Sequence, residues 1–135
     1  MKVICVARRP MEATYPHDVI SGEEALLAGV ASSTTFGGAP LTEYQWEFGD
    51  GTRSDRKPVD DHADGVALEA RHIYTGPLGR VFRATLTVWD DTGASGADDY
   101  YVRIRPDTLR TRAHIACDLA LWNLHKRMKR NDNPV

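Results

Sequence analysis

The sequence predicts a mainly β protein: an antiparallel β-sandwich of about seven strands followed by one C-terminal α-helix. Short runs of alternating apolar and polar residues recur between residues 2 and 105. Clusters of Gly, Pro, Asp and Ser separate these runs, as they separate strands in all-β folds. Residues 107–130 differ, because they contain neither Pro nor Gly and repeat apolar residues at helical spacing.

The N-terminal third predicts two or three strands. Residues 2–7 alternate within a β-rich run, and a short strand is expected at 19–20, at the end of a loop. Residues 24–31 have the composition of a helix, but the run is short and includes Gly29, so we expect a strand. Its inward residues would then be Leu26, Ala28 and Val30.

The clearest strand covers residues 43–48, where aromatic and polar side chains alternate. Tyr44, Trp46 and Phe48 fall on one face. The run Gly49-Asp50-Gly51 ends this strand, because glycine supplies the positive φ that a tight turn requires. The polar stretch 52–65 is expected to be a long loop or a ragged edge segment.

Three further alternating runs cover residues 66–74, 81–89 and 98–105, with turns between them at 76–79 and 90–93. Strands at this spacing are typical of a sandwich or a small barrel, in which two apolar sheet faces stack. The residues expected to face inward are Val66, Leu68, Ala70, His72 and Tyr74, then Phe82, Ala84, Leu86 and Val88, then Tyr100, Val102 and Ile104.

The last segment predicts a helix over residues 107–131, with Asp107 or Thr108 as its N-cap. Its apolar residues form two adjacent stripes, so one stripe can cover the sandwich while the other stays exposed unless a partner covers it. Two roles remain open for Leu119, Trp122, Leu124 and Met128: they dock a neighbouring domain or a second copy, or they cap an open end of the sandwich. We therefore divide the chain into a sandwich over 1–106 and a helix over 107–131, which either belongs to the sandwich or begins a following helical domain.

Charge is unevenly distributed along the 135 residues, although the formal net charge is only −2. Residues 1–102 hold 9 Lys and Arg and 16 Asp and Glu, a net of −7, whereas residues 103–135 hold 8 and 3, a net of +5. An acidic body would repel a polyanion, so we expect no nucleic-acid partner. No stretch approaches the roughly 20 apolar residues that span a bilayer, so we expect no membrane insertion.

Residues 44–52, Tyr-Gln-Trp-Glu-Phe-Gly-Asp-Gly-Thr, resemble the PKD (polycystic kidney disease) domain family. That family carries Trp-Asp-Phe-Gly-Asp-Gly on its third strand, and this chain has Glu47 where Asp is usual. The second family mark is His-x-Tyr, present as His72-Ile73-Tyr74, followed by a glycine turn and an alternating strand that ends in Asp. The resemblance covers roughly residues 20–105 and leaves the C-terminal helix outside the family pattern.

The resemblance implies an immunoglobulin-like sandwich without catalytic activity. It also implies that Trp46, Phe48, Gly49, Asp50, Gly51, His72 and Tyr74 form a structural motif. The sequence itself also indicates a protein without catalytic activity, because no Gly-x-Ser-x-Gly elbow and no Ser/His/Asp order is present. We expect no enzyme activity and no cofactor.

Metal binding has weak support in the sequence. Asp60, Asp61 and Asp64 crowd one loop and are candidates for calcium, but the Asp-x-Asp-x-Asp-Gly spacing is absent, so solvated acidic loops are the favoured interpretation. Zinc lacks a Cys-x-x-Cys pair. For Cys5 and Cys117 a disulfide is one alternative, and two buried free thiols are the favoured one.

The functional expectation is a non-catalytic module of a larger surface or secreted protein, serving as a spacer and as a protein or carbohydrate interaction domain. The N-terminal apolar run covers five residues, too short for a secretory signal. Either the protein stays inside the cell or the chain is a segment of a longer extracellular or cell-surface chain, and we favour the segment. The alternatives are an accessory domain of an extracellular enzyme and a unit that self-associates through its helix. The sequence does not identify the protein or polysaccharide partner.

Overall fold

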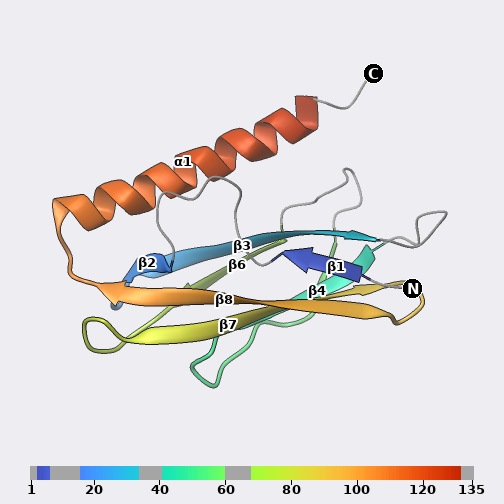
Figure 1. The fold of residues 1–135 in the computed structure, drawn as a ribbon, viewed down its shortest axis with the longest axis horizontal. Helices are drawn as coiled ribbons and strands as arrows, with labels where there is room; N and C mark the ends of the chain where they lie inside the picture. The colour runs from blue at the N-terminus through green and yellow to red at the C-terminus, as the bar shows by residue number, and fades with distance from the viewer. Residues whose placement is uncertain (1–2, 7–15, 34–40, 60–67, 132–135) are drawn as a thin grey trace.

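The structure is a computed structural model and describes residues 3–6, 16–33, 41–59 and 68–131. Within these ranges the chain forms eight strands and one helix (Figure 1). The elements are β1 Val3–Val6, β2 His17–Ile20, β3 Glu24–Ser33, β4 Leu41–Glu47, β5 Lys57–Pro58, β6 Leu68–Ile73, β7 Val81–Asp90, β8 Ser95–Arg105 and α1 Leu109–Asn131.

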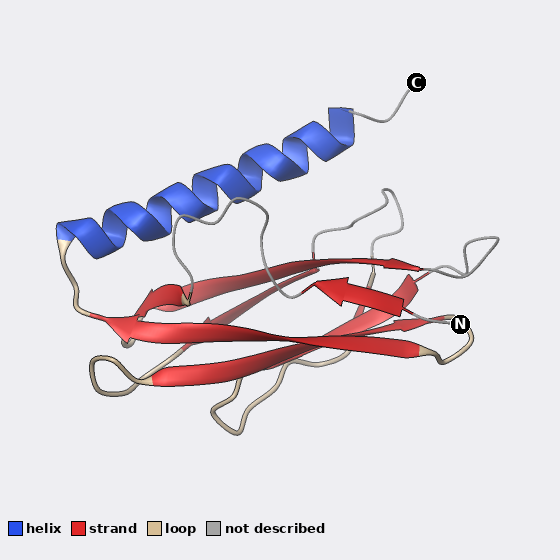
Figure 2. Cartoon of the chain, viewed as in Figure 1, coloured by secondary structure: helices blue, strands red, loops and turns tan. Residues whose placement is uncertain are grey.

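The strands form two sheets, one of three strands in the order β1-β3-β6 and one of five in the order β2-β8-β7-β4-β5. Neighbouring strands are antiparallel except β2, which pairs in parallel with the C-terminal end of β8, His17 lying opposite Val102. The N-terminal segment therefore contributes one short strand to each sheet. Figure 2 shows the strands gathered in one body and the helix outside it.

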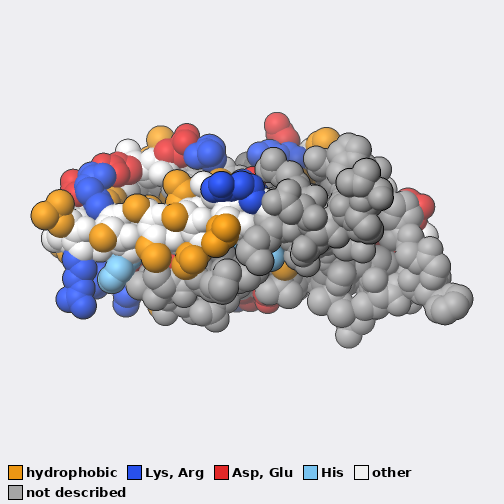
Figure 3. Space-filling view, turned by 90° about the horizontal axis from the view of Figure 1, so that it is seen from above, with side chains coloured by type: hydrophobic (Ala, Val, Ile, Leu, Met, Phe, Trp, Pro, Cys, Tyr) orange, Lys and Arg blue, Asp and Glu red, His pale blue; other side chains and the backbone are white. Residues whose placement is uncertain are grey.

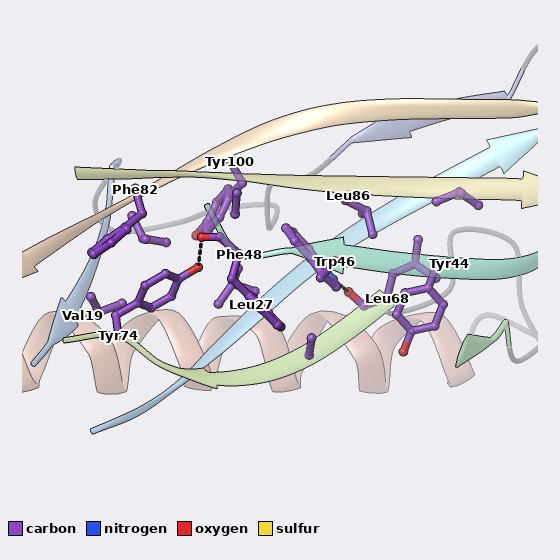
Figure 4. Packing of buried hydrophobic residues seen from close by; sticks show 14 of the residues in the cluster. Val19, Leu27, Tyr44, Trp46, Phe48, Leu68, Tyr74, Phe82, Leu86 and Tyr100 are labelled. Carbon is purple, nitrogen blue, oxygen red and sulfur yellow. Dashed lines mark hydrogen bonds between the residues drawn. The ribbon is translucent and has the colours of Figure 1, made fainter. Parts of the chain in front are cut away.

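The core lies between the two sheets and follows the predicted alternation in β4, β7 and β8. Its largest fully buried side chains include Trp46, Tyr74 and Tyr100. Figure 4 shows these rings and their aliphatic neighbours meeting between the sheets. The cluster contains Val19, Leu27, Ala31, Tyr44, Trp46, Phe48, Leu68, Ala70, Tyr74, Phe82, Ala84, Leu86, Val88, Tyr100, Val102 and Ile104.

Three polar groups of core aromatics join the two sheets. The indole nitrogen of Trp46 on β4 donates to the carbonyl oxygen of Leu68 on β6, at 3.0 Å and fully buried. The hydroxyl of Tyr44 donates to the carbonyl of Glu69 at 3.0 Å, and that of Tyr74 to the carbonyl of Phe48 at 2.9 Å. Because a buried N–H or O–H without a partner is costly, these bonds fix how the sheets face each other.

The predicted side-chain alternation of β3 is wrong. Leu27 and Ala31 face the core, with Ala25 packed at its edge, instead of Leu26, Ala28 and Val30. Ala28 is nonetheless fully buried, and its cross-strand neighbour is Glu69, whose side chain contacts the helix. Since both faces of β3 are covered near this position, alternation in the sequence does not distinguish them.

The helix α1 begins as predicted, because the Thr108 hydroxyl accepts the backbone N–H of Thr111 at 3.2 Å and so provides the N-cap. In Figure 1 the chain leaves the end of β8 and α1 returns over the sandwich, on the side of β2, β3 and β6. At 1.5 Å per residue its 23 residues span about 35 Å, close to the length of an 11-residue strand.

Replacing Trp46 should test the core. Trp46→Ala removes the largest buried side chain and leaves the Leu68 carbonyl without its donor, so we expect a loss of about 3–5 kcal/mol in the free energy of unfolding. Urea denaturation followed by circular dichroism measures this loss. Leu78→Ala, at a turn residue that is 67% exposed, is the control and should change stability by less than about 0.5 kcal/mol. Equal effects of the two substitutions would contradict this account of the core.

Candidate functional site

The turn after β4 is built by two glycines and one carboxylate. Gly49 has φ +84°, and a Cβ at this position would collide with the backbone carbonyl of Arg83, so no other residue fits. The Asp50 side chain accepts the backbone N–H of Thr52 at 3.0 Å and also accepts the Thr52 hydroxyl. The turn is thereby closed by its own side chains, an arrangement that Asp favours.

His72 on β6 contacts this turn from the opposite sheet. Its Nε2 lies 2.6 Å from Asp50 Oδ2 and 3.4 Å from the Thr52 hydroxyl. The imidazole stacks on the Phe48 ring with centroids 3.9 Å apart, and meets the Tyr74 ring edge-on at 4.8 Å. The residues of the sequence motif therefore form one cluster that joins the ends of β4 and β6.

The cluster brings a carboxylate, an imidazole and a hydroxyl together, the groups of a hydrolytic triad. In a triad, however, the carboxylate binds one ring nitrogen and the nucleophile the other. Here Asp50 and Thr52 both approach Nε2 of His72, and the Thr52 hydroxyl points to Asp50. This geometry gives the hydroxyl no general base of its own.

The electrostatics of the cluster favour a charged carboxylate. Partial burial alone would raise the pKa of Asp50, but hydrogen bonds from Thr52 and His72 outweigh it and hold that pKa below its usual range. Burial raises the pKa of the Tyr74 hydroxyl, and the nearby Asp50 charge adds to the effect. Asp50 thus acts as a fixed acceptor for its neighbours.

A second turn repeats the chemistry of the first. At the β7–β8 turn, Asp90 Oδ1 accepts the backbone N–H of Thr92 at 2.9 Å, the Thr92 hydroxyl at 2.6 Å and the N–H of Ala94 at 3.0 Å. Both turns carry Asp-x-Thr, at 50–52 and 90–92, a spacing visible in the sequence. The repeat supports a structural role for Asp in this motif.

The helix rests on the sandwich through Trp122. This side chain is fully buried, and its indole N–H donates to the Glu69 carboxylate on β6 at 3.0 Å. Lys126 contacts the same carboxylate at 3.1 Å. Of the two roles left open for Trp122, the structure therefore supports packing on the sandwich and not a place on an exposed docking surface.

The rest of the inward face of α1 is largely polar. Thr111 and Asp118 are buried, and Asp118 lies 3.6 Å from His17 Nδ1 on β2. His114 lies 3.8 Å from Asp18, which also faces Arg103 on β8 at 3.5 Å. These polar contacts, the Lys126–Glu69 ion pair and the Trp122 ring thus hold the helix.

The remaining residues predicted from the sequence differ in exposure, and several of them lie outside the described residues. Leu119 and Leu124 are 40% and 45% exposed, whereas the side chain of Met128 lies outside the described residues. Cys117 is exposed and free, so the expectation that it is buried is wrong. Asp60, Asp61 and Asp64 and the side chain of Cys5 also lie outside the described residues.

Among the described residues no group of three or more His, Cys, Asp and Glu side chains is arranged to hold a metal ion. Within the same part of the chain, no helix combines the length and the hydropathy that crossing a membrane requires.

Comparison with one solved structure supports the fold. The PKD domain of an M14-like peptidase from Thermoplasmatales archaeon SCGC AB-540-F20 superposes with a TM-score of 0.53 at 14% identity, covering 78% of this chain and 94% of that one. The PKD1 domain of the Vibrio cholerae metalloprotease PrtV gives a TM-score of 0.36 at 20% identity, covering 62% of this chain and 94% of that domain. A comparison with curated proteins finds no match.

The family comparison covers most of the sandwich. A family model described as PKD domain matches residues 7–104, from before β2 to Ile104, the last residue but one of β8. The match includes both marks noted in the sequence, residues 44–52 and 72–74, and it stops before α1. The chain therefore belongs to the PKD domain family, with an immunoglobulin-like sandwich and an added C-terminal helix.

Proposed function

We propose that this chain is a non-catalytic accessory module of a larger extracytoplasmic protein, where it positions neighbouring segments and offers a surface for binding protein or polysaccharide. One observation supports the non-catalytic role best: Asp50 and Thr52 of the turn after β4 bind each other, and His72 of β6 contacts both of them through Nε2. The similar solved domain from an M14-like peptidase supports an enzyme as one parent, with its active site elsewhere.

The places where the chain enters and leaves the sandwich determine how the module would position its neighbouring segments. In Figure 1, β1 and the end of β8 lie toward opposite ends of the sandwich, which suits a linear spacer. The helix then runs back over the sandwich, toward the end where β1 begins. We infer that α1 brings a segment attached after it close to a segment attached before β1. The module would then hold its two neighbours side by side and not at opposite ends of the sandwich.

The structural role of Asp50 predicts an acid-sensitive contribution to stability. Because hydrogen bonding lowers its pKa in the folded state, Asp50 stabilises the fold above its unfolded pKa of about 3.9, and this contribution disappears as the pH falls through the folded pKa. Asp50→Asn should therefore lower the free energy of unfolding by roughly 1 kcal/mol near neutral pH, since it removes charge-assisted bonds. The difference in the free energy of unfolding between wild type and variant, called the gap, should become smaller below about pH 4.

Urea denaturation at about pH 6 and about pH 3 measures this gap. Asp91→Asn, in the exposed turn after β7, is the matched control and should give a gap close to zero at both values. A gap for Asp50→Asn that stays constant over the whole range would refute the role assigned to the carboxylate.

A hydrolysis assay tests the non-catalytic role. The purified chain is incubated with dye-labelled casein and with dye-labelled soluble polysaccharides, beside the Trp46→Ala variant. We expect the same background release from both proteins, because the Thr52 hydroxyl beside His72 has no general base of its own. Product release by wild type that is lost in His72→Ala or Thr52→Ala would overturn the proposal.

The surrounding reading frame tests the extracytoplasmic assignment. We expect a secretory signal upstream of this segment and at least one further domain in the same polypeptide. A reading frame without any export signal would contradict the assignment while leaving the fold and the non-catalytic role in place.

A further inference from the structure

The face of α1 turned away from the sandwich is apolar. Six exposed residues form this outer face at helical spacings of one, three or four residues: Leu109, Ala113, Ala116, Cys117, Ala120 and Leu124. Leu109 is 89% exposed and Leu124 45%. Figure 3 shows hydrophobic side chains running along the helix on this side of the molecule. A surface helix normally buries its apolar residues and exposes its polar ones, so these six exposed residues depart from the usual pattern.

The outer face is also basic at both ends. Arg110 and Arg127 are exposed near its two ends, and neither forms an ion pair with a described residue. Of the residues 109–127, Asp118 is the one acidic side chain, and it is buried against the sandwich. The two arginines are 17 residues apart, or about 26 Å along the helix axis. A complementary partner must offer an apolar surface with carboxylates at a similar separation.

We propose that the outer face of α1 binds an acidic amphipathic α-helix of a partner protein. The proposal rests on the interaction role given above and specifies its surface and its partner. The Ala113, Ala116 and Ala120 side chains allow the backbone of a partner helix to approach closely, while Leu109 and Leu124 supply apolar contact at the ends. Acidic groups near both ends of the partner would pair with the two arginines.

Two other occupants fit these observations less well. A second copy bound through the same face would bring arginines of the same sign together, since the outer face carries no exposed acid. Membrane-surface helices bury Trp, Phe and Leu, whereas here Trp122 points into the sandwich and three of the six outer residues are alanines. An acidic helix fits both the small side chains and the positive charge of the outer face.

Binding of a designed peptide tests the proposal. The probe is a dye-labelled synthetic helix of about 20 residues, long enough to cover about 30 Å, with Ala and Leu on one face and Glu beside it. A matched peptide carries Lys in place of each Glu. Fluorescence anisotropy with the full chain should show saturable binding of the Glu peptide, and at least about tenfold weaker binding of the Lys peptide.

Variants of the chain separate the apolar and the charged contributions. Ala116→Glu, in the middle of the outer face, should weaken binding of the Glu peptide at least about tenfold. The double variant Arg110→Glu with Arg127→Glu should reverse the preference toward the Lys peptide. Leu78→Glu, on an exposed turn of the sandwich, is the control and should bind as wild type does. Circular dichroism melting of each variant establishes that it is folded, and the charge-reversal pair tests the proposal even where Ala116→Glu is unfolded.

Four results would overturn the proposal: no saturable binding of the Glu peptide, equal binding of the two peptides, a wild-type dimer in sedimentation that Ala116→Glu abolishes, or Ala116→Glu-sensitive co-sedimentation with vesicles of phosphatidylglycerol and phosphatidylcholine. The third would assign the face to a second copy and the fourth to a lipid surface. None of them would produce hydrolysis of casein or polysaccharide, so failure here and failure of the non-catalytic assignment remain distinguishable.

Discussion

The buried hydrogen bond from the Trp46 indole to the Leu68 carbonyl determines how the two sheets meet. Among the described residues the two sheets share no strand pairing, since β4 belongs to the five-stranded sheet and β6 to the three-stranded one. Apolar packing alone would allow the sheets to slide, because it is not directional. An indole N–H inside the core must find an acceptor, and only one relative placement of β4 and β6 supplies it. The Tyr44 and Tyr74 hydroxyls repeat this constraint on either side of Trp46.

The strands and the turn motif could be predicted from the sequence because both depend on local patterns. Alternation in β4, β7 and β8 has a period of two, and the side chains it placed inward are buried. The residue types of Gly49 and Asp50 were sufficient to predict the turn after β4. The pairing of Asp50 with His72 joins residues that lie 22 positions apart on different sheets, so spacing could not place it, and only the resemblance to the PKD family linked the two marks.

Contacts with the helix could not be predicted in the same way, because they depend on which face of the sandwich the helix covers. β3 was placed out of phase since the helix side of this strand is covered too, and Ala28 is as deeply buried as Leu27. In α1, the two apolar stripes were recognised, but their roles depended on polar partners in the sandwich. Glu69 provides the acceptor for Trp122, and Asp18 and His17 face the helix beside it. Hydrophobicity alone therefore could not decide between docking a partner and packing on the sandwich for Trp122, which is buried against the sandwich.

Glu69 connects the core, the helix and the outer face. Its backbone carbonyl accepts the Tyr44 hydroxyl inside the sandwich, while its carboxylate accepts the Trp122 indole and the Lys126 ammonium group outside. The strand that positions this residue is the one held by Trp46 through the neighbouring Leu68. Because the anchor of the helix is a side chain of this fixed strand, α1 does not need a hydrophobic inner face to stay in place. The alanines and leucines of the outer face are thus left exposed, on a helix whose position the core already defines.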